Sequence, residues 1–353
     1  MELNLRLSKH FLDSLLIDKD EMSASSLKVL NQPIIVRNLG IVDRILNIHR
    51  IKVPSKCSTV LRLIQDNFPE ISVDEYDTND SNNNDDNTAA DTSTSARSFR
   101  ISIQENTNNL ELPLNSALWY SQLEKDSISV NPIVYPWDFH YTVQRILREE
   151  LTETSISPNA SIPKSTVIDG PCIIEDGVSI DDFCKIKGPT YIGKGSFIGM
   201  SSLIRNCMIG NNTRIGFNCE IGRSYFVGRD IVPHQNVIVD SLVGENVWFG
   251  AYSATDNILP KKQKITYEIG KGNVIDTGMD HFGAVIGNNC TISTSVIFRP
   301  GSHLLKNTFI QALWKTYQIS KSPESKNRYW PAGTEKSRIQ DNKPNSYYEY
   351  LER

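Results

Sequence analysis

The sequence predicts two fold classes in one chain: an α/β N-terminal domain followed by an all-β, left-handed parallel β-helix of hexapeptide repeats. The first observation is a ladder of nine isoleucines, one at every sixth position from Ile156 to Ile204. The second is a frame that slips by one residue, resumes at Ile209 and continues to Val227, with glycine after each ladder residue. The third is that residues 1–140 lack this repeat. A period of six fits neither a helix nor an ordinary strand, but it is typical of a β-solenoid.

The repeat itself predicts how the β-helix is held together. Three short strands make one triangular coil, and the aliphatic residue of each hexapeptide points inward. The glycine that follows suits a tight bend between two flat faces, where a side chain would crowd the corner. Each coil contacts only its neighbours, so stacking buries the isoleucine ladder continuously.

The N-terminal domain mixes helical and extended patterns, which favours a compact α/β or α+β unit. Residues 33–36 (PIIV) predict a short strand. Residues 58–67 carry apolar side chains at helical spacing and predict a helix. Residues 99–103 alternate as a strand does. Residues 137–150 predict a helix that leads directly into the first coil at 152–157.

One stretch of this domain predicts no regular structure. Residues 77–97 are rich in Asn, Asp, Ser and Thr and contain almost no apolar side chain. Such a segment cannot bury enough surface to offset its ordering entropy, so we expect a disordered surface loop. An interaction segment is the alternative.

The end of the repeat predicts where function lies. The hexapeptide frame loosens over 229–241, returns at Val243 and departs again over 251–283, before resuming at Ile286. Loops that leave a solenoid on one side often form its binding face. We therefore assign residues 141–303 to the β-helix. The aromatic-rich residues 304–353 are expected to cap its open end or to pack against a neighbouring subunit.

Composition excludes several classes of protein. A chain of 353 residues favours two domains. The net charge of -4 and the isoelectric point near 5.9 predict no nucleic-acid partner. No apolar run approaches the roughly 20 residues of a spanning helix, so we expect no membrane attachment and a cytoplasmic location. The six cysteines form no zinc-like spacing, and most lie inside the repeat, where small buried thiols are expected.

Residues 220–259 resemble the acetyltransferase domain of the GlmU-like family, in which a sugar-1-phosphate nucleotidyltransferase is joined to an amino-sugar-phosphate acetyltransferase. The motifs that carry the resemblance are Pro233-His234, Val239-Asp240-Ser241, Val243-Gly244-Glu245-Asn246 and Gly250-Ala251 with Asn257. A second match spans 276–289 and closes at 299–301. The resemblance extends over residues 137–301. It implies a left-handed β-helix, a homotrimer with sites between subunits, and acetyl-CoA or another acyl-CoA as co-substrate.

The resemblance also implies roles for single residues. Acyl transfer to an amine needs a base, and histidine titrates nearest neutral pH, so His234 is the expected catalytic residue. Ala251 lies where the family's backbone meets the acyl-CoA, and a backbone N–H of the 250–253 turn is expected to stabilise the oxyanion. Asn257 aligns with a sugar-binding or oxyanion-side Asn, and a turn that bonds its own backbone is the alternative. Asp240 is expected to orient His234 or to bind sugar hydroxyls, or else to be a solvated corner residue.

Several other positions complete the expected site. Lys261, Lys262 and Lys264 form a positive cluster suited to a phosphate or to the pyrophosphate of coenzyme A, with a solvated loop as the alternative. His281 replaces the family's Lys before Gly-Ala and is expected to contact substrate. Val237 and Val239 replace a Tyr and a Gly of the family pattern. These differences imply either a changed acceptor or a site that binds without turnover.

The N-terminal domain departs further from the family. Gly40 is the only glycine before Phe99, so the glycine-rich phosphate loop of a nucleotidyltransferase is missing. We interpret residues 1–140 as a reduced, nucleotidyltransferase-like domain or as an unrelated docking domain, and expect no metal site for acyl transfer. The favoured function is an acyl-CoA-dependent N-acyltransferase acting on an amino-sugar phosphate or sugar nucleotide. The alternatives are a noncatalytic trimeric scaffold that binds a sugar nucleotide and, less favoured, a retained nucleotidyltransferase.

Overall fold

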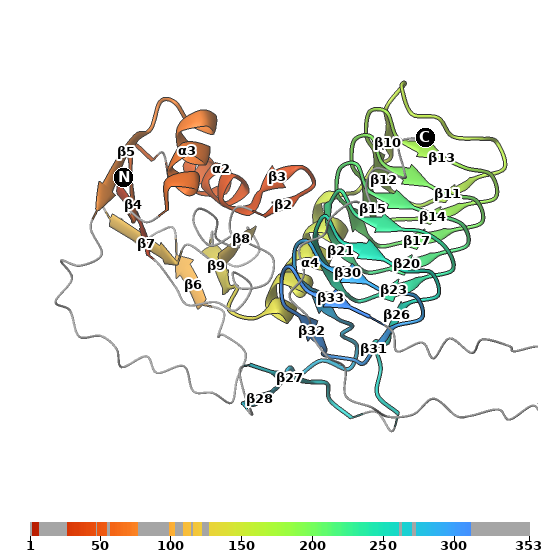
Figure 1. Cartoon of the computed structure of the whole chain (residues 1–353). Helices are drawn as coiled ribbons and strands as arrows, with labels where there is room; N and C mark the ends of the chain where they lie inside the picture. Colours follow the sequence, from red (N-terminus) through yellow and green to blue (C-terminus); the bar gives the residue numbers. More distant parts are fainter. Residues whose placement is uncertain are drawn as a thin grey trace, which may run out of the picture.

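The structure, a computed structural model, consists of an α/β unit and a β-helix with one long helix, α4, between them (Figure 1). It describes residues 2–6, 27–46, 48–54, 57–76, 99–102, 109–113, 116–121, 127–260, 263–269 and 273–311. The predicted loop at 77–97 lies outside the described residues, as do residues 312–353 of the predicted cap. Both predicted fold classes are confirmed.

The α/β unit contains a parallel sheet with the strand order β5-β4-β1-β7. Its strands are β1 (Glu2–Arg6), β4 (Arg50–Pro54), β5 (Ser72–Tyr76) and β7 (Asn109–Pro113). Helices α2 (Ile34–Leu46) and α3 (Ser58–Asn67) connect β1 to β5 along the chain, and α3 has the predicted bounds. An antiparallel sheet adds β6 (Phe99–Ser102), β9 (Ser127–Pro132) and β8 (Ser116–Ser121), and β2 (Lys28–Val29) pairs with β3 (Gln32–Pro33).

The strand predicted over residues 33–36 is wrong, because α2 begins at Ile34. The buried side chains of this helix are Ile34, Ile35, Val36, Leu39 and Val42. The first three alone are compatible with a buried strand or a buried helix. The burial of Leu39 and Val42, three residues apart, continues the apolar stripe at helical spacing and packs it against the sheet.

Helix α4 (Pro136–Glu150) confirms the helix predicted over 137–150. Pro136 occupies the first helical turn, where a missing N–H costs nothing, and Asp138 accepts hydrogen bonds from the backbone N–H groups of Val134 at 3.1 Å and Tyr135 at 2.8 Å. One hydrophobic cluster joins α4 to both neighbours: it includes Trp119 of the α/β unit and Tyr225 of the β-helix. The far end of α4 is tied to α2 by Arg37 and Glu150 (2.6 Å from Nε to Oε1). We infer that α4 fixes the position of the α/β unit against the β-helix.

The β-helix has three parallel sheets, each named here by its first strand. The β10 sheet contains β10 (Ser155–Ile156), β12 (Cys172–Ile174), β15 (Thr190–Ile192), β18 (Met208–Ile209), β21 (Tyr225–Gly228), β24 (Leu242–Glu245), β29 (Val285–Ile286) and β32 (His303–Leu304). The β11 sheet contains β11 (Val167–Asp169), β14 (Lys185–Lys187), β17 (Leu203–Arg205), β20 (Glu220–Gly222), β23 (Val237–Val239), β26 (Ala254–Thr255) and β31 (Ile297–Phe298). The β13 sheet contains β13 (Ser179–Ile180), β16 (Phe197–Ile198), β19 (Arg214–Ile215), β22 (Ile231–Val232), β25 (Trp248–Phe249), β30 (Thr291–Ile292) and β33 (Phe309–Ile310).

The isoleucine ladder forms the core of the β-helix, as predicted. Every ladder residue from Ile174 to Ile221 is at most 2% exposed. Ile156 is 42% exposed, because it lies in the first coil and only one neighbouring coil covers it. The next inward residue after Ile221 is Phe226, which is fully buried, and not the predicted Val227. The frame slip therefore recurs once per coil, and each later regular coil is 17 residues long.

Two further predictions about the repeat change. The frame does not loosen over 229–241, since Val232 and Ile238 are fully buried ladder residues. The excursion begins after β26 and not at residue 251, because Thr255 occupies a buried ladder position. The excursion contains an antiparallel hairpin of β27 (Thr266–Glu268) and β28 (Val274–Asp276). The coils then continue through β33, beyond the predicted end at 303.

The glycines after the ladder residues are required by the neighbouring coil. A Cβ added to Gly216 would lie 1.5 Å from the carbonyl oxygen of Pro233, and one added to Gly210 would lie 2.0 Å from that of Val227. The predicted crowding is therefore confirmed, and its source is backbone. The left-handed turns themselves lie three residues before the ladder residue, where asparagine is common; Asn206, Asn212 and Asn218 have φ of 53° to 56°.

The six cysteines are all buried and free, as predicted for small apolar side chains in the repeat. No helix among the described residues is long and apolar enough to cross a membrane.

Candidate functional site

The predicted catalytic residue lies on the corner between the β13 and β11 sheets, which we call the His234 corner. His234 is exposed and lies between β22 and β23. Ala251 occupies the same corner 17 residues later, so it lies on the next coil. The two coils are joined here by a hydrogen bond of 3.1 Å from the N–H of Tyr252 to the carbonyl oxygen of His234. The structure therefore brings His234 and Ala251 together.

A buried amide supports this corner. Asn236 is fully buried; its Nδ2 donates to the carbonyl oxygen of His234 at 3.0 Å, and its Oδ1 accepts from the N–H of Ser253 at 2.9 Å. Both halves of the amide are satisfied, so the backbone that carries His234 is fixed to the next coil. Sequence analysis missed Asn236. Its signal is its position two residues before ladder residue Ile238, where neighbouring coils carry small side chains such as Cys219 and Ser253.

The backbone of the 250–253 turn offers one free donor. The N–H groups of Gly250, Tyr252 and Ser253 donate to Ile292, His234 and Asn236, respectively. Within the described part of the chain, the N–H of Ala251 has no acceptor. Ala251 is thus the residue of this turn whose amide can meet a negative charge.

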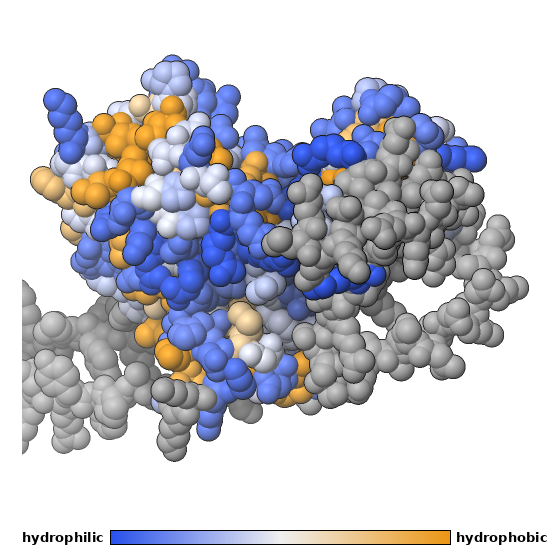
Figure 2. All heavy atoms as spheres, turned by 180° about the vertical axis from the view of Figure 1, so that it is seen from behind, coloured by the Kyte–Doolittle hydropathy of each residue, from blue (hydrophilic) through white to orange (hydrophobic). Residues whose placement is uncertain are grey.

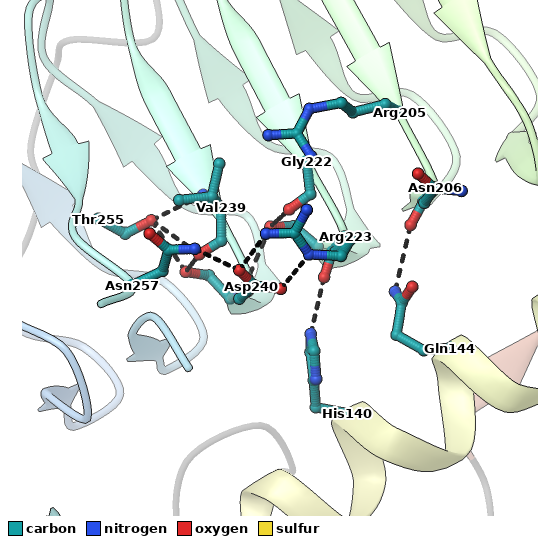
Figure 3. A network of polar contacts seen from close by, with 12 residues as sticks. His140, Gln144, Arg205, Asn206, Gly222, Arg223, Val239, Asp240, Thr255 and Asn257 are labelled. Carbon is teal, nitrogen blue, oxygen red and sulfur yellow. Dashed lines mark hydrogen bonds and ion pairs between the residues drawn. The ribbon is translucent and has the colours of Figure 1, made fainter. Parts of the chain in front are cut away.

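Asp240 lies on a second corner, between the β11 and β10 sheets, which we call the Asp240 corner (Figure 3). It is 2% exposed and has a φ of 47°. Arg223 grips its carboxylate in a bidentate pair, Nε to Oδ1 and Nη2 to Oδ2, both at 2.6 Å. Asn257 Nδ2 donates to Oδ2 at 2.5 Å. Asn257 therefore bonds across to Asp240, and not to its own backbone as in the alternative considered from sequence.

The expectation that Asp240 orients His234 is wrong within one chain. The two residues lie at opposite ends of β23, and the Asp240 carboxylate is already bonded to Arg223 and Asn257. Nor is Asp240 a solvated corner residue, since its side chain is 3% exposed. Its observed role is to hold Arg223 and Asn257 in place.

The buried carboxylate of Asp240 gives a stability prediction. Asp240→Asn should lower the free energy of unfolding by about 1–3 kcal/mol, because it removes the charge that satisfies the Arg223 guanidinium. Asparagine tolerates the positive φ at this position, so the backbone adds no cost of its own. The control is Asp169→Asn, which breaks an exposed pair with Lys185 (3.4 Å) and should change stability by less than about 0.5 kcal/mol. Urea unfolding measures both, and equal stability of the two variants would contradict the prediction.

Helix α4 lies along the Asp240 corner and bonds to successive coils (Figure 3). His140 Nε2 lies 2.7 Å from the carbonyl oxygen of Arg223, and Gln144 Nε2 donates to that of Asn206 at 3.1 Å. The two helical residues are four apart and their acceptors are 17 apart, so one helical turn matches one coil. Because a carbonyl oxygen only accepts, Nε2 of His140 carries the proton and Nδ1 is an acceptor. Nδ1 is buried and has no hydrogen-bond partner among the described residues.

Burial lowers the pKa of His140, against the opposing effects of the Asp240 charge and of the bond to the Arg223 carbonyl; the Arg223 charge adds to the lowering. Below about pH 6.5 the unfolded chain therefore binds a proton that the folded chain does not, and stability is lost as the pH falls. His140→Gln keeps an N–H donor for Arg223 but does not titrate. Between pH 7.5 and 5 the wild type should lose stability faster than this variant, by up to about 1.4 kcal/mol per pH unit.

Urea unfolding at a series of pH values measures this difference. Other titrating groups are common to both proteins and cancel, including Asp138, whose pKa burial raises to about 6, and His303, whose pKa burial lowers. Parallel stability curves for the two proteins would contradict the prediction.

A cavity of about 440 Å³ opens between α4, the Asp240 corner and the excursion. Its lining residues are His140, Tyr141, Gln144, Arg223, Asp240, Met279 and His281. The structure thus brings the predicted residues Asp240 and His281 together, on a different corner from His234. Lys264 pairs with Asp280 (2.9 Å), the neighbour of His281, while Lys261 and Lys262 lie outside the described residues.

Sequence analysis missed Arg223, His140 and Gln144. Arg223 had a signal, because it precedes Asp240 by one coil of 17 residues and carries the opposite charge. His140 and Gln144 had none, since only the docking of α4 places them on this corner. No group of His, Cys, Asp and Glu side chains in the described part of the chain could hold a metal ion.

Comparisons with known proteins cover this part of the chain. Residues 151–252 match the GMPPB C-terminal domain. This match confirms the resemblance to a β-helix of the kind joined to nucleotidyltransferases, over a segment that includes both corners but not the excursion. No curated protein matches the chain.

Solved structures of β-helical enzymes are similar at low identity. A putative acetyltransferase from Bacillus cereus is 18% identical, with 44% of this chain and 79% of that chain covered and a TM-score of 0.32. A mutant of perosamine N-acetyltransferase from Caulobacter crescentus, in complex with CoA and GDP-perosamine, is 12% identical, with 48% and 61% covered and a TM-score of 0.26. A UDP-N-acetylglucosamine acyltransferase is 18% identical, with 45% and 68% covered and a TM-score of 0.18. Likeness at this level carries no argument about the reaction.

Proposed function

We propose that this chain is an acyl-CoA-dependent N-acyltransferase that acts on an amino-sugar phosphate or a sugar nucleotide, with acetyl-CoA as the first donor to test. The observation that carries the proposal is the His234 corner. There an exposed histidine, held in place by the buried Asn236, lies one coil from the free amide of Ala251. A base beside an oxyanion donor is the minimum that acyl transfer requires.

The chemistry follows from these two groups. The amine of the acceptor attacks the thioester carbonyl carbon, and the carbonyl oxygen becomes negatively charged. The N–H of Ala251 donates to that oxygen, which lowers the energy of the tetrahedral intermediate. His234 takes the proton from the attacking nitrogen. The C–S bond then breaks, and coenzyme A leaves as its thiol after accepting a proton.

The second wall of the site is proposed to come from another copy of the chain. His234 lies on a convex corner, so one copy alone cannot enclose a ligand. Exposed apolar side chains surround it: Met200, Phe217, Val237 and Tyr252 are 40% to 59% exposed. Apolar side chains also gather on the β-helix in the view from behind (Figure 2). Packing of this corner against a second copy in a homotrimer would bury these side chains.

The experiment that tests the function uses the purified full chain. Acetyl-CoA is mixed with glucosamine 1-phosphate, glucosamine 6-phosphate or UDP-glucosamine, and released thiol is measured with a thiol reagent while mass spectrometry detects the acylated sugar. We expect thiol release that depends on one acceptor and matches product formation. No thiol release with any acceptor would contradict the proposal. Light scattering tests the trimer against the 39.8 kDa of one chain.

A noncatalytic, sugar-nucleotide-binding scaffold is the second candidate, and the α/β unit supports it. In the order β5-β4-β1-β7 the chain moves one way from β1 to β5 and then returns to the other side of β1. Ligands of open parallel sheets bind at the carboxyl ends of the strands where the order reverses, here between β1 and β7. Thermal stabilisation by a sugar nucleotide but not by coenzyme A would favour this candidate.

A further inference from the structure

We propose that the cavity between α4, the Asp240 corner and the excursion is a binding site for an uncharged polyhydroxylated sugar ring, separate from the His234 corner. Its volume of about 440 Å³ lies within the range of roughly 300–1,000 Å³ usual for small-molecule sites. Its walls come from three parts of the chain that are distant in sequence.

The polar groups of the cavity match a hydroxyl. Arg223 uses Nε and Nη2 for Asp240, so its remaining N–H bonds are donors at the cavity wall. His140 is 4% exposed, and its Nδ1 is an acceptor without a partner among the described residues. A hydroxyl accepts from one group and donates to the other. A phosphate dianion only accepts, so it would leave Nδ1 of His140 unsatisfied.

The charge of the cavity favours a neutral ligand over an anion. The carboxylate of Asp240 compensates the guanidinium of Arg223 through two hydrogen bonds of 2.6 Å. The Lys264 ammonium on the excursion is likewise compensated by Asp280. An incoming phosphate would therefore have to compete with carboxylates that already hold these cations.

The apolar part of the cavity matches the C–H face of a sugar ring. Tyr141 projects from α4 with 51% of its surface exposed, and Met279 lies half-buried on the excursion. An aromatic face beside hydrogen-bonding groups presents one apolar and one polar surface, as a pyranose ring does. Because the Asp240 and His234 corners lie at opposite ends of β23, the two sites can be occupied independently.

Saturation-transfer NMR on the full chain, without acyl-CoA, tests the site with three probes: methyl α-D-glucopyranoside, glucose 1-phosphate and inorganic phosphate. We expect both sugars to bind and phosphate alone not to bind. Tyr141→Ala should weaken glycoside binding about tenfold or more. The matched control is Tyr252→Ala, which removes a similarly exposed ring at the His234 corner and should leave glycoside binding unchanged.

The outcomes are distinct. Binding of phosphate but not of the glycoside would overturn the proposal in favour of an anion site. Loss of glycoside binding in Tyr252→Ala but not in Tyr141→Ala would place the sugar at the His234 corner and also overturn it. Met279→Ala gives a second variant should Tyr141→Ala fail to fold, and wild-type affinity in Met279→Ala would count against the site. Failure of the acyl-transfer assay would not affect these results, because no acyl donor is present.

Discussion

Replacing His234 with alanine is expected to lower kcat for acyl transfer by about 10²- to 10⁴-fold, the usual contribution of a general base. The side chain is exposed, and the bonds of this corner run through its carbonyl oxygen, which alanine retains. The variant should therefore fold normally, and the loss should appear in the rate of thiol release and not in the unfolding midpoint.

The matched control for this variant is His49→Ala. His49 is also exposed but lies in the α/β unit, away from the β-helix corners. Its removal should leave kcat unchanged. If His234→Ala retained kcat within about threefold of the wild type, His234 would not be the base, and the reaction would need another proton acceptor.

Gly216→Ala is expected to lower the free energy of unfolding by about 3 kcal/mol or more, at the upper end for overpacked cores. The added Cβ would lie 1.5 Å from the carbonyl oxygen of Pro233, and both groups belong to backbone. Relief would require the two coils to separate, but the N–H of Gly216 donates to Val232 at 2.7 Å. Because Pro233 precedes His234, the same displacement should also reduce acyl transfer.

Gly40→Ala is the control for this substitution. Gly40 lies inside α2, and a Cβ there meets no atom within 4 Å. Alanine is favoured over glycine in a helix by about 1 kcal/mol, so this variant should be slightly more stable than the wild type. Urea unfolding compares the two. Equal stability of Gly216→Ala and the wild type would show that the coils separate without cost.

The sequence came close to the inward positions of the β-helix but missed their phase at one point. At residues 226 and 227 two large apolar side chains are adjacent, and a period alone does not choose between them. The pairing of Phe226 with Val243 on the next coil makes the choice, because the strands must remain in register. The strand expected at 33–36 failed for a similar reason, since a few consecutive apolar residues suit a buried strand or a buried helix equally.

The sequence by itself determined the β-helix, helices α3 and α4, and the two corners that carry His234 and Asp240, since these depend on local spacing and on contacts between neighbouring coils. Only the tertiary structure decided which of these residues share a site. A coil of 17 residues places Arg223 against Asp240 and Ala251 beside His234, while β23 separates the two pairs. The docking of α4 adds His140 to the Asp240 corner through contacts 83 residues apart in the chain. Such contacts depend on how whole surfaces pack, and no local pattern in the sequence encodes them.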